Sequence, residues 1–175
     1  IICVIAMNKT KVIQDVTEWI NTFVTKPNTL LNNFPPCPYA RKAMLDKKVD
    51  IRVPTEGTVS YAIADTLATW NNDLDLVMLV FDAHHYDADM FADVVAKAND
   101  TIDTNFVLLD DHPGNEENIN GVKMNNGDYA IVFVQKTDKL DEGHRYLSEH
   151  TDYYDVWSQE NLDDVVTWRK DRKRS

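Results

Sequence analysis

Apolar residues recur along this chain with two different periods, and these periods predict alternating helices and strands. Between residues 11 and 24 the apolar positions are spaced by three and four, which predicts an amphipathic helix with one broad apolar face. The segment 74–81 instead contains an unbroken apolar run from Leu76 to Phe81, which is typical of a strand buried on both faces of a sheet. Residues 105–109 predict a second buried strand.

Capping residues and turn signals place the remaining elements. Thr58 is suited to cap one helix, and Asp87 or Asp89 to cap another that runs to about Ile102. The run from Asn125 to Asp128 is a turn signal, so residues 121–124 and 129–135 are expected to form a hairpin. The other expected elements are a helix of about ten residues opening at 37–40, a strand at 49–53, and helices near 141–149 and 159–170.

This order predicts an α/β fold: a central, mostly parallel mixed sheet of four or five strands with flanking helices. The last strand is expected to run antiparallel. A thioredoxin-like or a ferredoxin-like variant would fit. We expect one domain over 7–170, with residues 1–6 as an upstream extension or a first strand and 171–175 as a basic tail.

Charge and cysteine content narrow the classes of partner. The chain has 175 residues and a formal net charge of −11, a field that repels nucleic acid and anionic membranes. The longest apolar runs are too short to span a bilayer. Two cysteines are too few for a disulfide framework and fit a cytoplasmic protein. No glycine-rich phosphate loop or nucleophile elbow is present.

Polar clusters follow both buried strands. If those strands are parallel neighbours, the clusters leave the sheet at one edge, where ligands of such sheets usually bind. Imidazoles and carboxylates there could hold a divalent metal, zinc or iron, or perform acid–base chemistry. Helix capping and a solvated loop are the alternative interpretation. The candidate metal ligands are Asp82, His84, His85, Asp111 and His112.

Cys37 is a second candidate site. A cysteine at a helix N-terminus meets the positive end of the helix dipole, which favours the thiolate, and Arg41 would add positive charge one turn later. The glutaredoxin active site also begins Cys-Pro-Tyr, but Ala40 stands where its second cysteine would be. A small cysteine that anchors the helix is the structural alternative.

The segment Cys37-Pro38-Tyr39-Ala40, with Trp19 before it and His112-Pro113 after it, resembles a bacterial family of uncharacterised proteins with a Leu-Cys-Pro-Phe-Ala motif. The resemblance covers about residues 11–113. It implies a helix, strand, helix order after the cysteine and no established activity. It also suggests that Cys37 and His112 approach one another, as a thiolate–imidazole pair or as two ligands of one metal.

Three functions therefore stay open. The first is an enzyme that uses Cys37, with Arg41 and His112 as the other catalytic candidates. The second is a metal-binding protein or metal-dependent hydrolase at the predicted sheet edge. The third is a non-catalytic acidic interaction domain or a homodimer.

Overall fold

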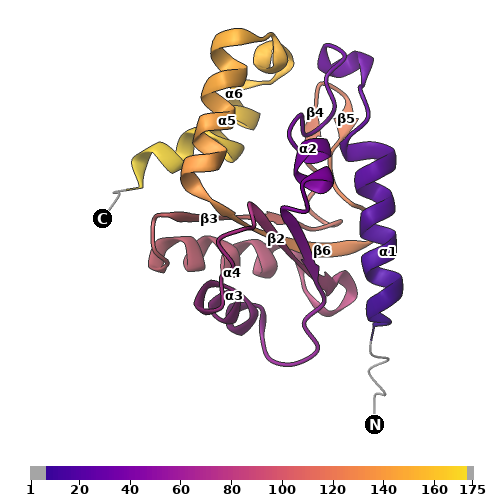
Figure 1. The fold of residues 1–175 in the computed structure, drawn as a ribbon, viewed down its shortest axis with the longest axis vertical. Coiled ribbons are helices and arrows are strands. Elements are labelled where there is room, and N and C mark those ends of the chain that lie inside the picture. Colours follow the sequence, from indigo (N-terminus) through magenta and orange to yellow (C-terminus); the bar gives the residue numbers. More distant parts are fainter. Residues whose placement is uncertain (1–6, 173–175) are drawn as a thin grey trace.

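A mixed sheet of four strands, in the order β1-β2-β6-β3, forms the centre of the fold (Figure 1). The strands are β1 (Val49–Arg52), β2 (Leu76–Asp82), β3 (Phe106–Asp111) and β6 (Tyr129–Lys136). β1 pairs with β2 in parallel, and β6 pairs antiparallel with both β2 and β3. The α/β class, the four-stranded mixed sheet and the antiparallel last strand are confirmed.

The structure is a computed structural model that describes residues 7–172, with the backbone alone for Asp171. The predicted extension 1–6, which includes Cys3, and residues 173–175 of the predicted basic tail lie outside the described residues. Within the described part of the chain, no helix combines the length and the apolar character needed to cross a membrane.

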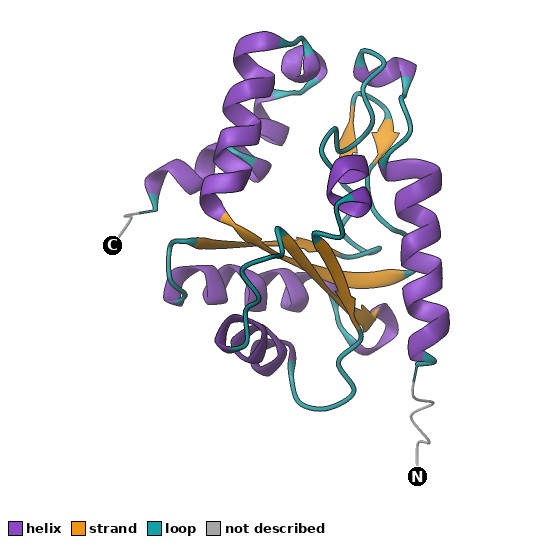
Figure 2. Ribbon diagram, in the orientation of Figure 1, coloured by secondary structure: helices purple, strands orange, loops and turns teal. Residues whose placement is uncertain are grey.

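Helices cover both faces of the sheet (Figure 2). α3 (Val59–Ala68) and α4 (Ala88–Thr101) pack on one face, and α1 (Lys9–Trp19) with α2 (Ala40–Leu45) packs on the other. The strands supply both cores because successive side chains point to opposite faces. In β2, Val77, Leu79 and Phe81 pack toward α3 and α4, while Met78 and Val80 pack toward α1.

Side-chain caps explain where three helices begin. The Thr58 side chain accepts from the N–H of Tyr61, and Asp87 accepts from the N–H groups of Asp89 and Met90, so both predicted caps are confirmed. The first helix is capped by Asn8, whose side chain accepts from the N–H of Lys11. It continues as a π-helical turn over Ile20–Val24.

The predicted hairpin between residues 121–124 and 129–135 is wrong. β5 (Val122–Lys123) pairs with β4 (Asn118–Ile119) to form a small separate hairpin. Its turn residues Asn120 and Gly121 have φ angles of 49° and 88°, which suit a tight two-residue turn. β6 instead enters the sheet between β2 and β3.

The chain after β6 folds as α5 (Thr137–His150), α6 (Gln159–Val165) and two 3₁₀ turns, Tyr153–Val156 and Thr167–Asp171. Two basic residues near the end of the described chain make structural contacts. Arg169 is buried beside Asp141, and Arg172 donates to the carbonyl groups of Phe106 and Asn99. Arg172 lies within the predicted tail, yet it is bonded to the backbone of β3 and α4.

Candidate functional site

The predicted sheet-edge site required β2 and β3 to be neighbours, but β6 lies between them. β2 and β3 run in the same direction, but they are not neighbours. With β6 between them, their ends are about two strand spacings, roughly 10 Å, apart. The expectation of parallel neighbours is therefore wrong, and the two polar clusters are not presented side by side.

The three candidates after β2 interact mainly with each other. One oxygen of Asp82 accepts from the N–H of His84 and begins a 3₁₀ turn, Ala83–His85. The second oxygen lies 3.7 Å from His85 Nδ1, an ion pair only when that imidazole is protonated. His84 and His85 are exposed and Asp87 caps α4, which matches the alternative interpretation of helix capping and a solvated loop.

Asp111, the last residue of β3, and His112, which follows it, are buried, and the side chain of each makes two hydrogen bonds. Asp111 accepts from the side-chain amide of Asn125 and from the backbone N–H of Asn126, each at 2.9 Å. His112 uses both ring nitrogens: Nδ1 accepts from the N–H of Gly114, which leaves Nε2–H to donate to the carbonyl of Tyr86. The bond from His112 to Tyr86 links the end of β3 to the loop before α4, and the bonds to Asp111 link the end of β3 to the loop before β6. Both side chains therefore have a structural role.

Residues 7–172 contain no group of three or more His, Cys, Asp or Glu side chains placed to hold a metal ion. The predicted zinc or iron site of Asp82, His84, His85, Asp111 and His112 is therefore not assembled. The physical reason is the spacing set by β6, together with the backbone donors that already occupy Asp111 and His112.

A hollow of about 380 Å³ does lie at the carboxyl end of β2, on the side of α1. We call it the sheet-edge hollow. It contains two of the predicted site residues, Asp82 and His84, together with residues that the sequence did not single out. Its lining consists of Met7, Lys11, Asp15, Asp82, His84, Asp128 and Tyr129.

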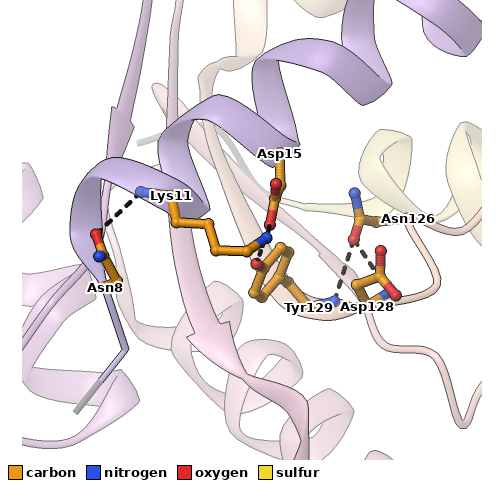
Figure 3. A network of polar contacts seen from close by, with 6 residues as sticks. All are labelled: Asn8, Lys11, Asp15, Asn126, Asp128 and Tyr129. Carbon is orange, nitrogen blue, oxygen red and sulfur yellow. Dashed lines mark hydrogen bonds and ion pairs between the residues drawn. The ribbon is translucent and has the colours of Figure 1, made fainter.

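A hydrogen-bonded network crosses this hollow from α1 to β6 (Figure 3). Asp15 accepts from the Tyr129 hydroxyl and from the Lys11 ammonium, each at 2.6 Å. The hydrogen bonds from these two donors lower the pKa of Asp15, so its carboxylate is ionised at neutral pH. Burial and the bond to Asp15 raise the pKa of Tyr129 to about 12, so its hydroxyl remains a donor.

Asp111 acts on this hollow from a distance. It receives the N–H of Asn126, and the Asn126 side-chain oxygen accepts from the N–H groups of Asp128 and Tyr129. These bonds fix the loop that brings Asp128 and Tyr129 to the hollow; Figure 3 shows the part formed by Asn126, Asp128 and Tyr129. The predicted metal ligand is thus a positioning residue.

Cys37 lies three residues before α2, and its N–H donates to the carbonyl of Val24. His112 packs against Phe91 of α4, and both of its ring nitrogens are engaged, by Gly114 and by Tyr86. His112 is not among the groups that shift the pKa of Cys37, so the suggested Cys37–His112 pair stays a prediction. Arg41 is exposed on α2 and is not among the groups that shift the pKa of Cys37. Cys37 itself is exposed as a residue, yet the protein around its sulfur disfavours the thiolate and raises the thiol pKa.

Three tyrosines lie near Cys37: Tyr39, Tyr153 and Tyr154. The Tyr39 hydroxyl donates to the carbonyl of Gly143, and the Tyr153 hydroxyl donates to the carbonyl of Pro36. The rings of Tyr154 and His144 pack edge to face, with their centroids 4.9 Å apart. Tyr154 is also near enough to Cys37 for the thiol to affect the pKa of its hydroxyl. Three buried polar atoms near Tyr154 have no hydrogen-bond partner among the described residues: His144 Nδ1, Trp157 Nε1 and Arg169 Nε.

Comparison with known proteins gives no relative for this chain: no family model, no curated protein and no solved structure matches it. The resemblance to the Leu-Cys-Pro-Phe-Ala family stays a prediction, as do the thioredoxin-like or ferredoxin-like assignment, the cytoplasmic location and the homodimer.

Proposed function

We propose that this protein binds a small organic cation, an amine, in the sheet-edge hollow. The observation that carries the proposal is the composition of that hollow: the carboxylates of Asp15, Asp82 and Asp128 outnumber the single ammonium of Lys11. Because binding sites complement the charge of their ligands, an ammonium group is favoured and an anion is disfavoured.

The network on Asp15 supports an amine over a bare metal ion. Its carboxylate already holds an ammonium, that of Lys11, at hydrogen-bonding distance. Tyr129 donates to the same carboxylate, which fixes its orientation before any ligand arrives. Asp82 and Asp128 line the same hollow and could receive a second ammonium group or further N–H donors.

The size and polarity of the hollow set the expected strength of binding. A linear diamine of six heavy atoms fits easily in about 380 Å³. Because the lining of the hollow is polar and open to solvent, we expect the diamine to bind weakly, with a dissociation constant of about 0.1–10 mM. Since the attraction is between charges that water reaches, binding should weaken as salt concentration rises.

Titration of the protein with 1,4-diaminobutane, followed by amide NMR shifts, tests the proposal. We expect the largest shifts at Lys11, Asp15, Asp82 and Tyr129. Succinate, which has the same chain length and the opposite charge, should cause no shifts in this hollow. The double variant Asp82→Asn/Asp128→Asn should weaken diamine binding at least tenfold, because two of the three carboxylates are lost.

Glu149→Gln is the matched control, since it removes an exposed carboxylate on α5 that does not line the hollow. It should bind the diamine like the original protein. Equal affinity in the double variant and the original protein would refute the proposal, as would shifts that spread over the acidic surface without favouring the hollow.

Thiol chemistry at Cys37 is a second candidate function, and one specific observation favours it. The backbone N–H groups of Tyr39 and Ala40 hydrogen-bond the Cys37 sulfur and lower the thiol pKa, against the larger effect of burial. A substrate that adds positive charge near the sulfur would tip this balance toward the thiolate. Aromatic side chains, Tyr39 and Tyr154 among them, would contact such a substrate.

The rate of iodoacetamide alkylation of Cys37 against pH tests the thiol function. Because the thiol pKa is raised in the free protein, the rate should keep rising above pH 9. A ligand that engages the thiol should shift this profile to lower pH. The test includes a screen of electrophilic and disulfide compounds as ligands. If none of them changes the pH dependence of alkylation, the thiol function is refuted and Cys37 has a structural role.

A further inference from the structure

A second hollow, of about 280 Å³, lies where β1 ends and the chain turns toward α3. We call it the β1–α3 hollow. Because β1 and β2 are parallel neighbours, it lies at the carboxyl end of a parallel strand pair, where α/β sheets usually bind their ligands. It shares no lining residue with the sheet-edge hollow, so the two are separate sites.

Thr66 of α3 contributes a buried hydroxyl group to this hollow. The residue is 2% exposed and lies on the buried face of the helix with Val59 and Ile63. The hydroxyl groups of Thr17 and Thr22 donate to the carbonyl four residues earlier. The Thr66 hydroxyl, by contrast, makes no hydrogen bond within residues 7–172. Because a buried hydroxyl without a partner is unfavourable, a ligand that brings a polar atom to Thr66 gains an interaction that the chain leaves unused.

Charged groups of both signs line the same hollow. Arg52 uses Nε for Asp50, at 2.7 Å, and its two terminal nitrogens bond to no other described residue. The Lys9 ammonium makes no hydrogen bond or ion pair in the described part of the chain. The carboxylates of Glu56 and Asp65 are exposed and are not paired with either cation. The hollow therefore offers free donors for a carboxylate and free acceptors for an ammonium group.

We propose that the β1–α3 hollow binds a small zwitterion, a free amino acid with a polar side chain. The terminal nitrogens of Arg52 suit a carboxylate, which accepts two parallel hydrogen bonds from such a fork, and Lys9 adds a second positive charge. Glu56 and Asp65 receive the ammonium group, and the polar side chain of the ligand reaches the Thr66 hydroxyl.

The lining also sets what the hollow excludes. A simple anion would face the two carboxylates without compensation, and a simple cation would face Arg52 and Lys9, so a ligand of one charge is disfavoured. Val53, Ala62 and Leu79 are buried and form an apolar part of the wall. About 280 Å³ is at the small end of ligand pockets, which fits an amino acid of the size of serine.

Amide NMR titration with L-serine and three analogues tests the proposal, because each analogue lacks one group of serine. Alanine lacks the hydroxyl, 2-aminoethanol lacks the carboxylate, and 3-hydroxypropionate lacks the amine. Serine should shift the amides of residues 52–56 and 61–66 and leave those of Asp15 and Tyr129 in place. Each analogue should bind about fivefold or more weakly than serine, since one set of interactions is lost.

Two variants separate the contributions. Arg52→Gln should weaken serine binding about tenfold and change 2-aminoethanol binding by less than about twofold, because only serine carries a carboxylate. Thr66→Val, which has nearly the same shape, should abolish the preference for serine over alanine. Arg145→Gln is the matched control for Arg52, since Arg145 is exposed on α5 and does not line the hollow. It should bind serine like the original protein.

Three outcomes would overturn the proposal. The first is an absence of shifts in residues 52–66 at about 50 mM serine, beyond the weakest affinity of a specific site. The second is equal binding of serine and either singly charged analogue. The third is a Thr66→Val protein that keeps the preference for serine over alanine.

Discussion

The hydroxyl group of Tyr129 donates a hydrogen bond of 2.6 Å to the carboxylate of Asp15, across 114 positions of the chain. This bond ties the first helix, α1, to β6, the last strand of the sheet, at the rim of the sheet-edge hollow (Figure 3). The Lys11 ammonium donates to the same carboxylate, and the two hydrogen bonds together lower the pKa of Asp15.

Replacing Tyr129 by Phe should raise the pKa of Asp15 toward its ordinary value, since one of the two donors to the carboxylate is lost. Lys11→Met should raise it further, because Lys11 contributes the larger effect. A lowered aspartate pKa gives stability that is present above the unfolded pKa and is lost as pH falls through the folded pKa. Both variants should therefore lose less stability on acidification. Carbon-13 NMR titration checks the order, and an unchanged Asp15 pKa in both would contradict it.

Replacing Asn99 by Ala should destabilise the protein by about 2–4 kcal/mol. The buried Asn99 side chain donates to the carbonyl of Leu108 and accepts from its N–H, so it satisfies the outer side of β3, an edge strand of the sheet. Without it, two backbone groups lose their partner. Urea denaturation measures the loss. Thr101→Ala, an exposed site on the same helix, should change stability by less than about 1 kcal/mol.

Replacing His112 by Ala should also cost about 2–4 kcal/mol, because the carbonyl of Tyr86 and the N–H of Gly114 both lose a buried partner. The alkylation rate of Cys37 in the folded variant should stay within about twofold of the original. A tenfold or larger change in that rate would support the idea that Cys37 and His112 act together.

Replacing Gly143 by Ala should displace the ring of Tyr39, because the new Cβ would lie 2.8 Å from its Cε2 atom. Alanine is better than glycine in a helix by about 1 kcal/mol, which offsets the lost hydrogen bond of Tyr39, so stability should change little. Alkylation of Cys37 should become faster as the ring moves away. Tyr39→Phe removes only the hydroxyl group and serves as the control; equal rates in all three proteins would show that Tyr39 does not shield the thiol.

Local patterns in the sequence were enough to predict the elements that local physics decides. Thr58 and Asp87 cap their helices because their side chains reach backbone N–H groups two or three residues away. The apolar runs of β2 and β3 indicated strands; β2 is buried except at its two end residues, and Val107 and Leu108 of β3 are buried. A continuous apolar run is buried whenever other elements cover both faces of the sheet, whichever strands are its neighbours.

Strand order and the candidate sites depended on contacts between distant parts of the chain. The turn signal after Asn125 was compatible with a hairpin, yet Asn125 and Asn126 bind Asp111 instead. β6 then enters between β2 and β3, which separates Asp82 from Asp111 and brings Tyr129 to Asp15. Periodicity determines which faces of a strand are buried, but strand neighbours are chosen by the packing of the whole sheet. For that reason the sequence could indicate an α/β fold, while only the tertiary structure could replace the predicted metal site with a hollow lined by Asp15, Asp82, Asp128 and Tyr129.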